Sequence, residues 1–335
     1  MRENMKKVLF ATTALLATSG FAMAQEMQVS GAAEAGIFGG SDIEDQFHTD
    51  VDVTFTGTGE TDTGLTFGFD IDLDEEIGDN NAVTGGAESG ATRDDSDDGG
   101  ASIFVSGAFG TITFGDTDGG FDWALQEAII GSSIRDDHEH AGYNGNAGLD
   151  GIYDGQIVRY EYAFADFAVA ASVEMDDDPD TDGDGNPVFG LGGKYTGDFA
   201  GVAFSAGLGY QTSDVDFDDE DVDDEGFDIY GLSLGAEFGG GFSAIANYSD
   251  LDGYNGNDSH TGIALGYTTG ALTVAANYGV FDRELDGEDD VSGYGLIANY
   301  DLGGGAEVQA GYGNNDFGDD DVDFDTYSLG VAMSF

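Results

Sequence analysis

The final residues, 327–335, alternate strictly between apolar side chains and small or polar ones. Tyr327, Leu329, Val331, Met333 and Phe335 hold the odd positions, with serine, glycine or alanine between them. A period of two gives a β-strand one apolar face and one polar face. The sequence then stops on an aromatic residue with no polar tail. Such a strand suits the wall of a barrel whose outer surface faces lipid.

The same alternation recurs throughout the chain, so we predict sixteen strands. Most are about ten residues long, the length at which a tilted strand crosses a bilayer. The predicted strands cover residues 26–38, 49–59, 64–73, 101–106, 111–115, 156–164, 167–175, 188–196, 199–211, 227–238, 242–249, 260–268, 272–281, 291–301, 306–313 and 323–335.

Short and long connections alternate between these strands. Turns such as Ala165-Asp166 and Thr269-Gly270 are short, whereas residues 74–98 and 176–187 form long, Asp-rich loops. Short turns on one rim and long loops on the other are typical of outer-membrane barrels. A soluble sandwich also alternates, but strand number, strand length and the terminal Phe335 favour the membrane protein. We therefore predict an all-β, sixteen-stranded antiparallel transmembrane β-barrel with short periplasmic turns and long acidic extracellular loops.

The N-terminal segment has the features of a secretory signal peptide. Lys6 and Lys7 precede the apolar stretch 8–16, and Ala22-Met23-Ala24 forms a small-x-small cleavage site. This segment is too short to span a bilayer as a stable helix. We expect a signal peptide at residues 1–24 and one barrel domain at residues 25–335.

The charge of the chain restricts its partners. Asp and Glu number 68 against 8 Lys and Arg, which gives a formal net charge of −60 at pH 7. Nucleic-acid phosphates would be repelled, so nucleic acid is not an expected partner, whereas cations are. The chain contains no cysteine, so no disulfide stabilises it after export.

The connection at residues 116–150 differs from the other long loops because it contains many apolar residues, including Trp123, the single tryptophan. Sixteen strands enclose more space than side chains can fill, so the interior must be aqueous. We predict that this third loop folds inward, packs its apolar residues on the inner wall and presents its acids to the channel. The alternative is an outward surface loop with a small apolar cluster.

Several short motifs, taken in order, resemble one family. Gly115-Asp-Thr-Asp-Gly-Gly-Phe-Asp-Trp-Ala124, Tyr143-Asn-Gly-Asn146 and the terminal Phe335 are similar to the general porins of alphaproteobacteria, the Rhodobacter-type group. The resemblance covers essentially the whole chain after the signal peptide. It implies a homotrimer in the outer membrane of a Gram-negative bacterium, with an inward third loop opposed by wall arginines.

The resemblance also implies a function and partners. We expect a general diffusion porin, and no enzyme, that passes small hydrophilic solutes and ions through a water-filled pore. Expected partners are outer-membrane lipid, lipopolysaccharide and, through Phe335, the outer-membrane assembly machinery. A substrate-specific outer-membrane channel is the alternative, followed by a secreted calcium-binding adhesin.

The candidate pore residues lie in the loop and on the wall. Arg159 is the best candidate for a wall arginine, although an Arg159–Glu161 structural pair is an equal alternative. Where the family has further basic wall residues, two early strands carry acids, which points to cation preference. The loop acids of the predicted constriction are Asp118, Asp122, Glu127, Asp136 and Asp137, and the wall acids are Asp50, Asp52, Asp70 and Asp72.

One further motif concerns metal ions. Asp180, Asp182 and Asp184, followed by Gly185, match the first half of a calcium-binding loop. The twelfth position is Leu191 instead of Glu, so a weak Ca²⁺ site and a solvated acidic loop both remain open. His138 and His140 lie close in sequence without an assigned third ligand. We expect no required cofactor.

Overall fold

The computed structural model describes residues 26–41, 43–76, 100–153, 155–175, 186–214, 226–284, 289–318 and 322–335. The expected signal peptide, residues 1–24, lies outside these ranges, as does the candidate calcium loop with Asp180, Asp182 and Asp184. Within them, no helix has the length and apolar character needed to cross a membrane.

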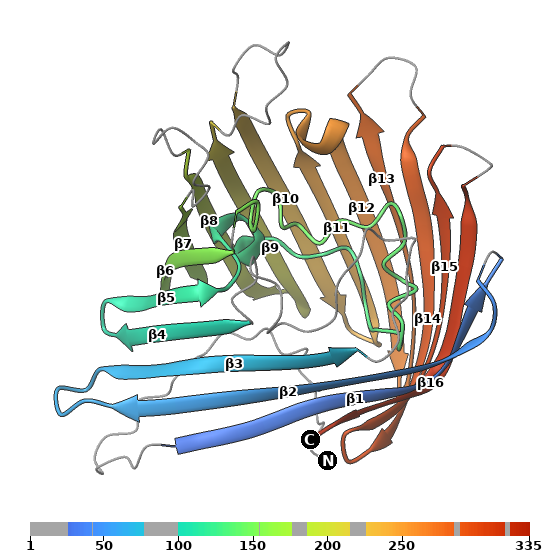
Figure 1. Ribbon diagram of the computed structural model, residues 1–335, viewed down its shortest axis with the longest axis horizontal. Helices are drawn as coiled ribbons and strands as arrows, with labels where there is room; N and C mark the ends of the chain where they lie inside the picture. Colours follow the sequence, from blue (N-terminus) through green and yellow to red (C-terminus); the bar gives the residue numbers. More distant parts are fainter. Residues whose placement is uncertain are drawn as a thin grey trace.

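The chain forms a closed antiparallel barrel of sixteen strands (Figure 1). The strands are β1 (Glu26–Gly40), β2 (Gln46–Glu60), β3 (Thr66–Glu76), β4 (Ala101–Gly107), β5 (Gly110–Asp116), β6 (Gln156–Phe164), β7 (Phe167–Glu174), β8 (Val188–Phe199), β9 (Val202–Ser213), β10 (Phe227–Phe238), β11 (Phe242–Asp250), β12 (Asn257–Thr269), β13 (Leu272–Arg283), β14 (Val291–Gly303), β15 (Ala306–Asp316) and β16 (Phe324–Ser334). In the connections that the structure describes, there are two short helical turns, α1 (Gly120–Ala124) and η1 (Tyr254–Gly256). The predicted all-β, sixteen-stranded antiparallel barrel is confirmed.

Each strand pairs with its neighbours in sequence, and the first strand pairs with the last to close the barrel. In this seam between β1 and β16, the register runs from Ala32 opposite Ser334 to Gly40 opposite Thr326. Closure leaves the sheet without an edge, so every strand has a hydrogen-bonded neighbour on both sides. A barrel without edges satisfies its backbone groups in lipid.

The two faces of the strands differ as the alternation predicts. In β10, Tyr230, Leu232 and Leu234 are 52%, 40% and 52% exposed, whereas Gly231 and Ser233 between them are buried. The side chains that are large, apolar and exposed therefore lie on the outer surface. Because a soluble protein would bury such residues, this pattern identifies an apolar surrounding outside the barrel.

Several predicted strand boundaries differ from the structure by a few residues, and two of them have a clear local reason. The predicted loop at residues 74–98 starts too early, because the backbone of β3 stays paired with β2 as far as Glu76 opposite Asp50. Phe199 belongs to β8 and not to the next strand. The turn that follows consists of Ala200 and Gly201, both with positive φ, which is the two-residue turn favoured between twisted strands.

Candidate functional site

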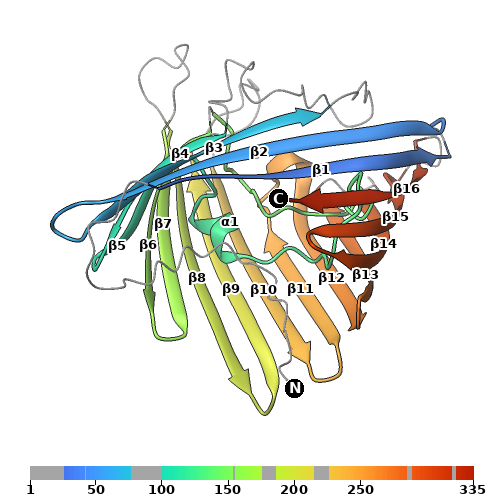
Figure 2. The same ribbon diagram turned by 90° about the horizontal axis from the view of Figure 1, so that it is seen from below.

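The connection between β5 and β6, residues 117–155, lies inside the barrel. We call it the third loop; Asp154 is outside the described residues. Figure 1 shows this segment, in green, running across the inner side of the strands from β9 to β15. Figure 2 places α1, near the start of the loop, within the ring of strands.

Hydrogen bonds hold the third loop to the inner wall along its length. They join loop atoms to side chains of β7, β9, β10, β13 and β15. The pairs are Gly120 N to Ser172 Oγ (2.7 Å), Gln126 N to Ser233 Oγ (2.9 Å), Gln309 Nε2 to Ser132 Oγ (2.9 Å), Asn277 Nδ2 to His138 O (2.7 Å), Ala141 N to Asn315 Oδ1 (2.8 Å) and Leu149 N to Gln211 Oε1 (2.6 Å). The polar inner face of the wall thus satisfies backbone groups that would otherwise be buried unpaired.

Apolar packing anchors the beginning and end of the loop at one place. Phe121, Leu125 and Leu149 form a buried cluster with Val188 and other wall residues. Beside it, the ammonium group of Lys194 lies 4.0 Å from the centroid of the Trp123 ring, a cation–π contact. The apolar residues that set this loop apart in the sequence therefore face the wall.

Glycines on the wall allow the loop backbone to come close. A Cβ atom at Gly192 would overlap the carbonyl oxygen of Gly120, and one at Gly207 would overlap that of Ala124. Both positions lie on the inner face of β8 and β9. Side chains there would push α1 away from the wall.

Three of the predicted loop acids lie near the start of the loop. Asp118 is exposed, while Asp122 and Glu127 are half-buried. Burial, together with the charges of Asp118, Asp150 and Glu127, raises the pKa of Asp122 to about 8. Burial also raises the pKa of Glu127, although a hydrogen bond from Tyr143 opposes the increase.

The other two predicted loop acids differ from each other in their exposure to solvent. Asp136 is exposed, whereas Asp137 is only 4% exposed. Asp137 lies against β15 and β16, where a Cβ atom at Gly313 would overlap its carbonyl oxygen. Burial raises the pKa of Asp137, and the hydroxyls of Ser328 and Thr326 partly offset this effect. Asp137 is therefore directed to the wall, away from the open interior.

Arg159 in β6 contacts acids on both the wall and the loop. Its Nε lies 3.8 Å from Glu161 Oε2, and its Nη1 lies 3.9 Å from Asp118 Oδ2. Nη1 also donates a hydrogen bond to the carbonyl oxygen of Asp118. The guanidinium group thus connects the wall with the start of the third loop, and two carboxylates balance its charge.

The four predicted wall acids lie on β2 and β3, on the polar side of these strands. Thr54 Oγ1 donates to Asp72 Oδ1 at 3.0 Å, and Thr56 Oγ1 donates to Asp70 Oδ1 at 2.7 Å. Asp50 and Asp52 precede these threonines on the same face of β2. Together, Asp50, Asp52, Asp70 and Asp72 form what we call the acidic wall.

Sequence reasoning missed several charged residues of the interior. Glu34 pairs in register with Asp50 and extends the acidic wall onto β1. Lys194 has the same parity as the inward Gly192, so strand alternation could have revealed it. Asp150 accepts hydrogen bonds from Gly119 N (2.7 Å) and Gln211 Nε2 (2.6 Å). Glu174 accepts from Gly151 N (2.9 Å) and Gly155 N (3.0 Å), contacts that no sequence signal reveals.

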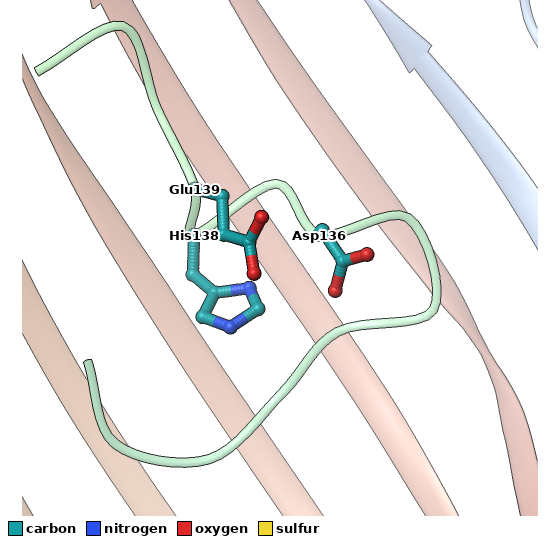
Figure 3. Close-up of side chains that lie close together, drawn as sticks. All are labelled: Asp136, His138 and Glu139. Atoms are coloured by element: carbon teal, nitrogen blue, oxygen red, sulfur yellow. The ribbon is translucent and has the colours of Figure 1, made fainter. Parts of the chain in front are cut away.

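One group of loop side chains could hold a metal ion. Potential ligand atoms of Asp136, His138 and Glu139 all lie within 4.8 Å of one another (Figure 3). Burial lowers the pKa of His138 to about 4, so its imidazole is neutral at pH 7. Burial and the charges of Asp136 and Glu127 raise the pKa of Glu139 to about 7.

Comparison with known proteins decides the family. The model of the Gram-negative porin family matches residues 11–320. The chain belongs to the Gram-negative porin family. It is 30% identical over 259 residues to a porin of Rhodobacter capsulatus, which covers 70% of this chain and 80% of that one. It is 31% identical over 156 residues to a monosaccharide porin of Halomonas, covering 41% of each.

A solved structure supports the same family. A porin structure refined at 1.8 Å resolution superposes with a TM-score of 0.70 and 27% identity, covering 92% of this chain and 100% of that one. The predictions of a porin barrel, of an outer-membrane location and of a channel instead of an enzyme are thereby confirmed. The porin described here has its polar wall residues and its third loop on the inside of the barrel.

Proposed function

We propose that this porin is a cation-selective diffusion channel for small hydrophilic solutes, narrowed by the third loop. The observation that carries the proposal is the distribution of charge inside the barrel. The acidic wall lies on β2 and β3, and Asp118, Asp122 and Glu127 lie on the loop, where Asp122 is mostly charged only above its pKa of about 8. In the described ranges, the basic residues are Arg135, Arg159, Lys194 and Arg283.

The basic residues nearest the loop offset only part of this charge, because three cations stand against the four acids of the wall and the three acids of the loop. Arg159 is balanced by Asp118 and Glu161, and Lys194 covers the ring of Trp123. Arg135 lies with its guanidinium carbon 4.4 Å from the centroid of the Phe38 ring. A lumen potential that favours cations by about 1.4 kcal/mol would enrich them roughly tenfold over a neutral pore.

Reversal potentials across a planar bilayer test the selectivity. With a salt gradient of KCl, we expect the sign that denotes K⁺ preference, and a smaller preference as the total salt concentration rises, because salt screens the fixed charges. A reversal potential of the opposite sign would contradict the proposal. Single-channel steps that close in groups of three would support the homotrimer that we also propose from the family.

The selectivity should depend on pH. The pKa of Asp122 is raised to about 8, and those of Glu139 and Asp150 to about 7. Carboxyl groups are neutral below their pKa, so lowering the pH from about 9 to about 6 removes negative charge from the loop. We expect the ratio of K⁺ to Cl⁻ permeability to fall over this range. An unchanged ratio would show that these acids do not reach the conducting path.

A substrate-specific channel is the second candidate, favoured by the similarity to the monosaccharide porin of Halomonas. A specific channel would show sugar flux that saturates with concentration, whereas a diffusion porin would not. Four further expectations stay predictions. They are export through the signal peptide, contact of Phe335 with the assembly machinery, contact with lipopolysaccharide, and Ca²⁺ binding at Asp180, Asp182 and Asp184.

A further inference from the structure

The loop cluster of Asp136, His138 and Glu139 combines one imidazole with two carboxylates. Figure 3 shows the three side chains gathered at one bend of the third loop, with the two carboxylates beside the imidazole ring. Their potential ligand atoms lie within 4.8 Å of one another. His138 is 3% exposed, while Asp136 and Glu139 are exposed. The imidazole of the cluster is therefore buried, whereas its two carboxylates are accessible to solvent.

Successive turns of the backbone fix this arrangement. Asp136 N donates to Ser133 O at 3.1 Å, and Glu139 N donates to Asp136 O at 2.7 Å. Asp136 adopts a positive φ of 48°, which folds the chain back on itself so that residues two and three positions further on come near its side chain. The backbone of the loop therefore already brings the three side chains near one another.

The wall of the barrel orients the imidazole. Asn277 Nδ2 donates to the carbonyl oxygen of His138 at 2.7 Å, and Ser133 Oγ lies 3.2 Å from His138 Nδ1. Ser133 is itself buried. These two contacts hold the residue and its ring in place at the bend of the loop.

We propose that Asp136, His138 and Glu139 form a binding site for a divalent transition-metal ion, with Zn²⁺ and Cu²⁺ as the preferred ions. The mixed nitrogen and oxygen donor set decides the class of metal. Imidazole suits Zn²⁺ and Cu²⁺, whereas Ca²⁺ and Mg²⁺ take oxygen ligands. Three protein ligands also leave a coordination position for water or a solute.

Binding there has a consequence for conduction. The ion adds two positive charges at a point of the loop where two carboxylates face each other, inside a barrel with few basic groups. Bound Zn²⁺ therefore reduces the attraction of the loop for permeating cations. This goes beyond the proposed diffusion function, because it assigns a ligand to residues that the family comparison does not.

The test uses the detergent-solubilised protein, produced without a histidine tag. With Cu²⁺ as the probe, electron paramagnetic resonance should show coupling to one imidazole nitrogen. With Zn²⁺, calorimetry should give saturable binding that survives an excess of Mg²⁺. We expect Glu139→Gln to weaken Zn²⁺ binding about tenfold or more, and His138→Gln to remove the nitrogen coupling.

A matched control comes from the end of β2. Glu60→Gln makes the same substitution at an exposed acid outside the third loop, so it should leave Zn²⁺ affinity within about twofold of the original. Single-channel recording without metal verifies that each variant still forms a pore. Equal losses for Glu60→Gln and Glu139→Gln, competition by Mg²⁺ at similar concentration, or Cu²⁺ spectra without nitrogen coupling would each overturn the site. None of these outcomes depends on cation selectivity. The proposal of a metal site can therefore be wrong while the proposal of a cation-selective channel is right, and the reverse.

Discussion

Replacing the acidic wall with amides should reduce K⁺ preference about tenfold at 10 mM salt. The variant carries Asp50→Asn, Asp52→Asn, Asp70→Asn and Asp72→Asn. A unit charge about 10 Å from an ion in water contributes roughly 0.4 kcal/mol, or about 0.3 kcal/mol after screening at this salt concentration. Four such charges give about 1.2 kcal/mol, close to a factor of ten. Reversal potentials measure the change directly.

The amide substitutions preserve the local structure, because asparagine can still accept the hydrogen bonds from Thr54 and Thr56. The matched control removes four acids near the short turns: Glu60→Gln, Asp62→Asn, Asp166→Asn and Asp198→Asn. We expect this control to shift the permeability ratio much less. At 0.1 M salt the effect of the acidic wall should shrink to about threefold as the Debye length falls. Equal effects of the two quadruple variants would mean that net charge, and not the position of the acids, sets the selectivity.

Truncating Phe121 should release the start of the third loop and widen the pore. Phe121 is 1% exposed and packs with Leu125, Leu149, Val188 and Ile229. Removing a buried phenylalanine costs about 3–5 kcal/mol, which is large compared with the few hydrogen bonds that hold α1. We expect Phe121→Ala to raise single-channel conductance and to accelerate the entry of larger sugars into proteoliposomes.

Phe114→Ala is the control for this experiment. Phe114 lies on β5, the strand that leads directly into the loop, but its side chain is 53% exposed on the outer surface. Its truncation removes the same side-chain atoms without touching the loop, so conductance should stay the same. If Phe121→Ala left conductance unchanged while the barrel remained intact, the third loop would not limit the pore.

The fold could be predicted well because strand alternation is a local property. In β10, the pattern gives both the bounds Phe227–Phe238 and the outward side chains Tyr230, Leu232 and Leu234. The end of β3 could not be predicted from this pattern, because pairing with β2 extends it as far as Glu76. Backbone hydrogen bonds to a neighbour continue a strand even where its side chains are charged.

The candidate site could be predicted only in part. Residue type and position identified Asp118, Asp122 and Arg159, which the structure brings together near the start of the loop. The burial of Asp137 could not be foreseen, because it depends on glycines in β15 far along the sequence. The role of Glu174, whose carboxylate accepts hydrogen bonds from loop amides, likewise depends on a tertiary contact.

The seam between β1 and β16 has a consequence for biosynthesis. Its partners, such as Ala35 and Val331, come from opposite ends of the polypeptide. Contacts between such distant segments form slowly, since the entropy of closing a long chain must be overcome first. Until the last strand arrives, the growing sheet has two open edges that invite aggregation. The barrel therefore cannot close until both ends of the chain are present, and before that the first and last strands each leave a row of backbone groups unpaired.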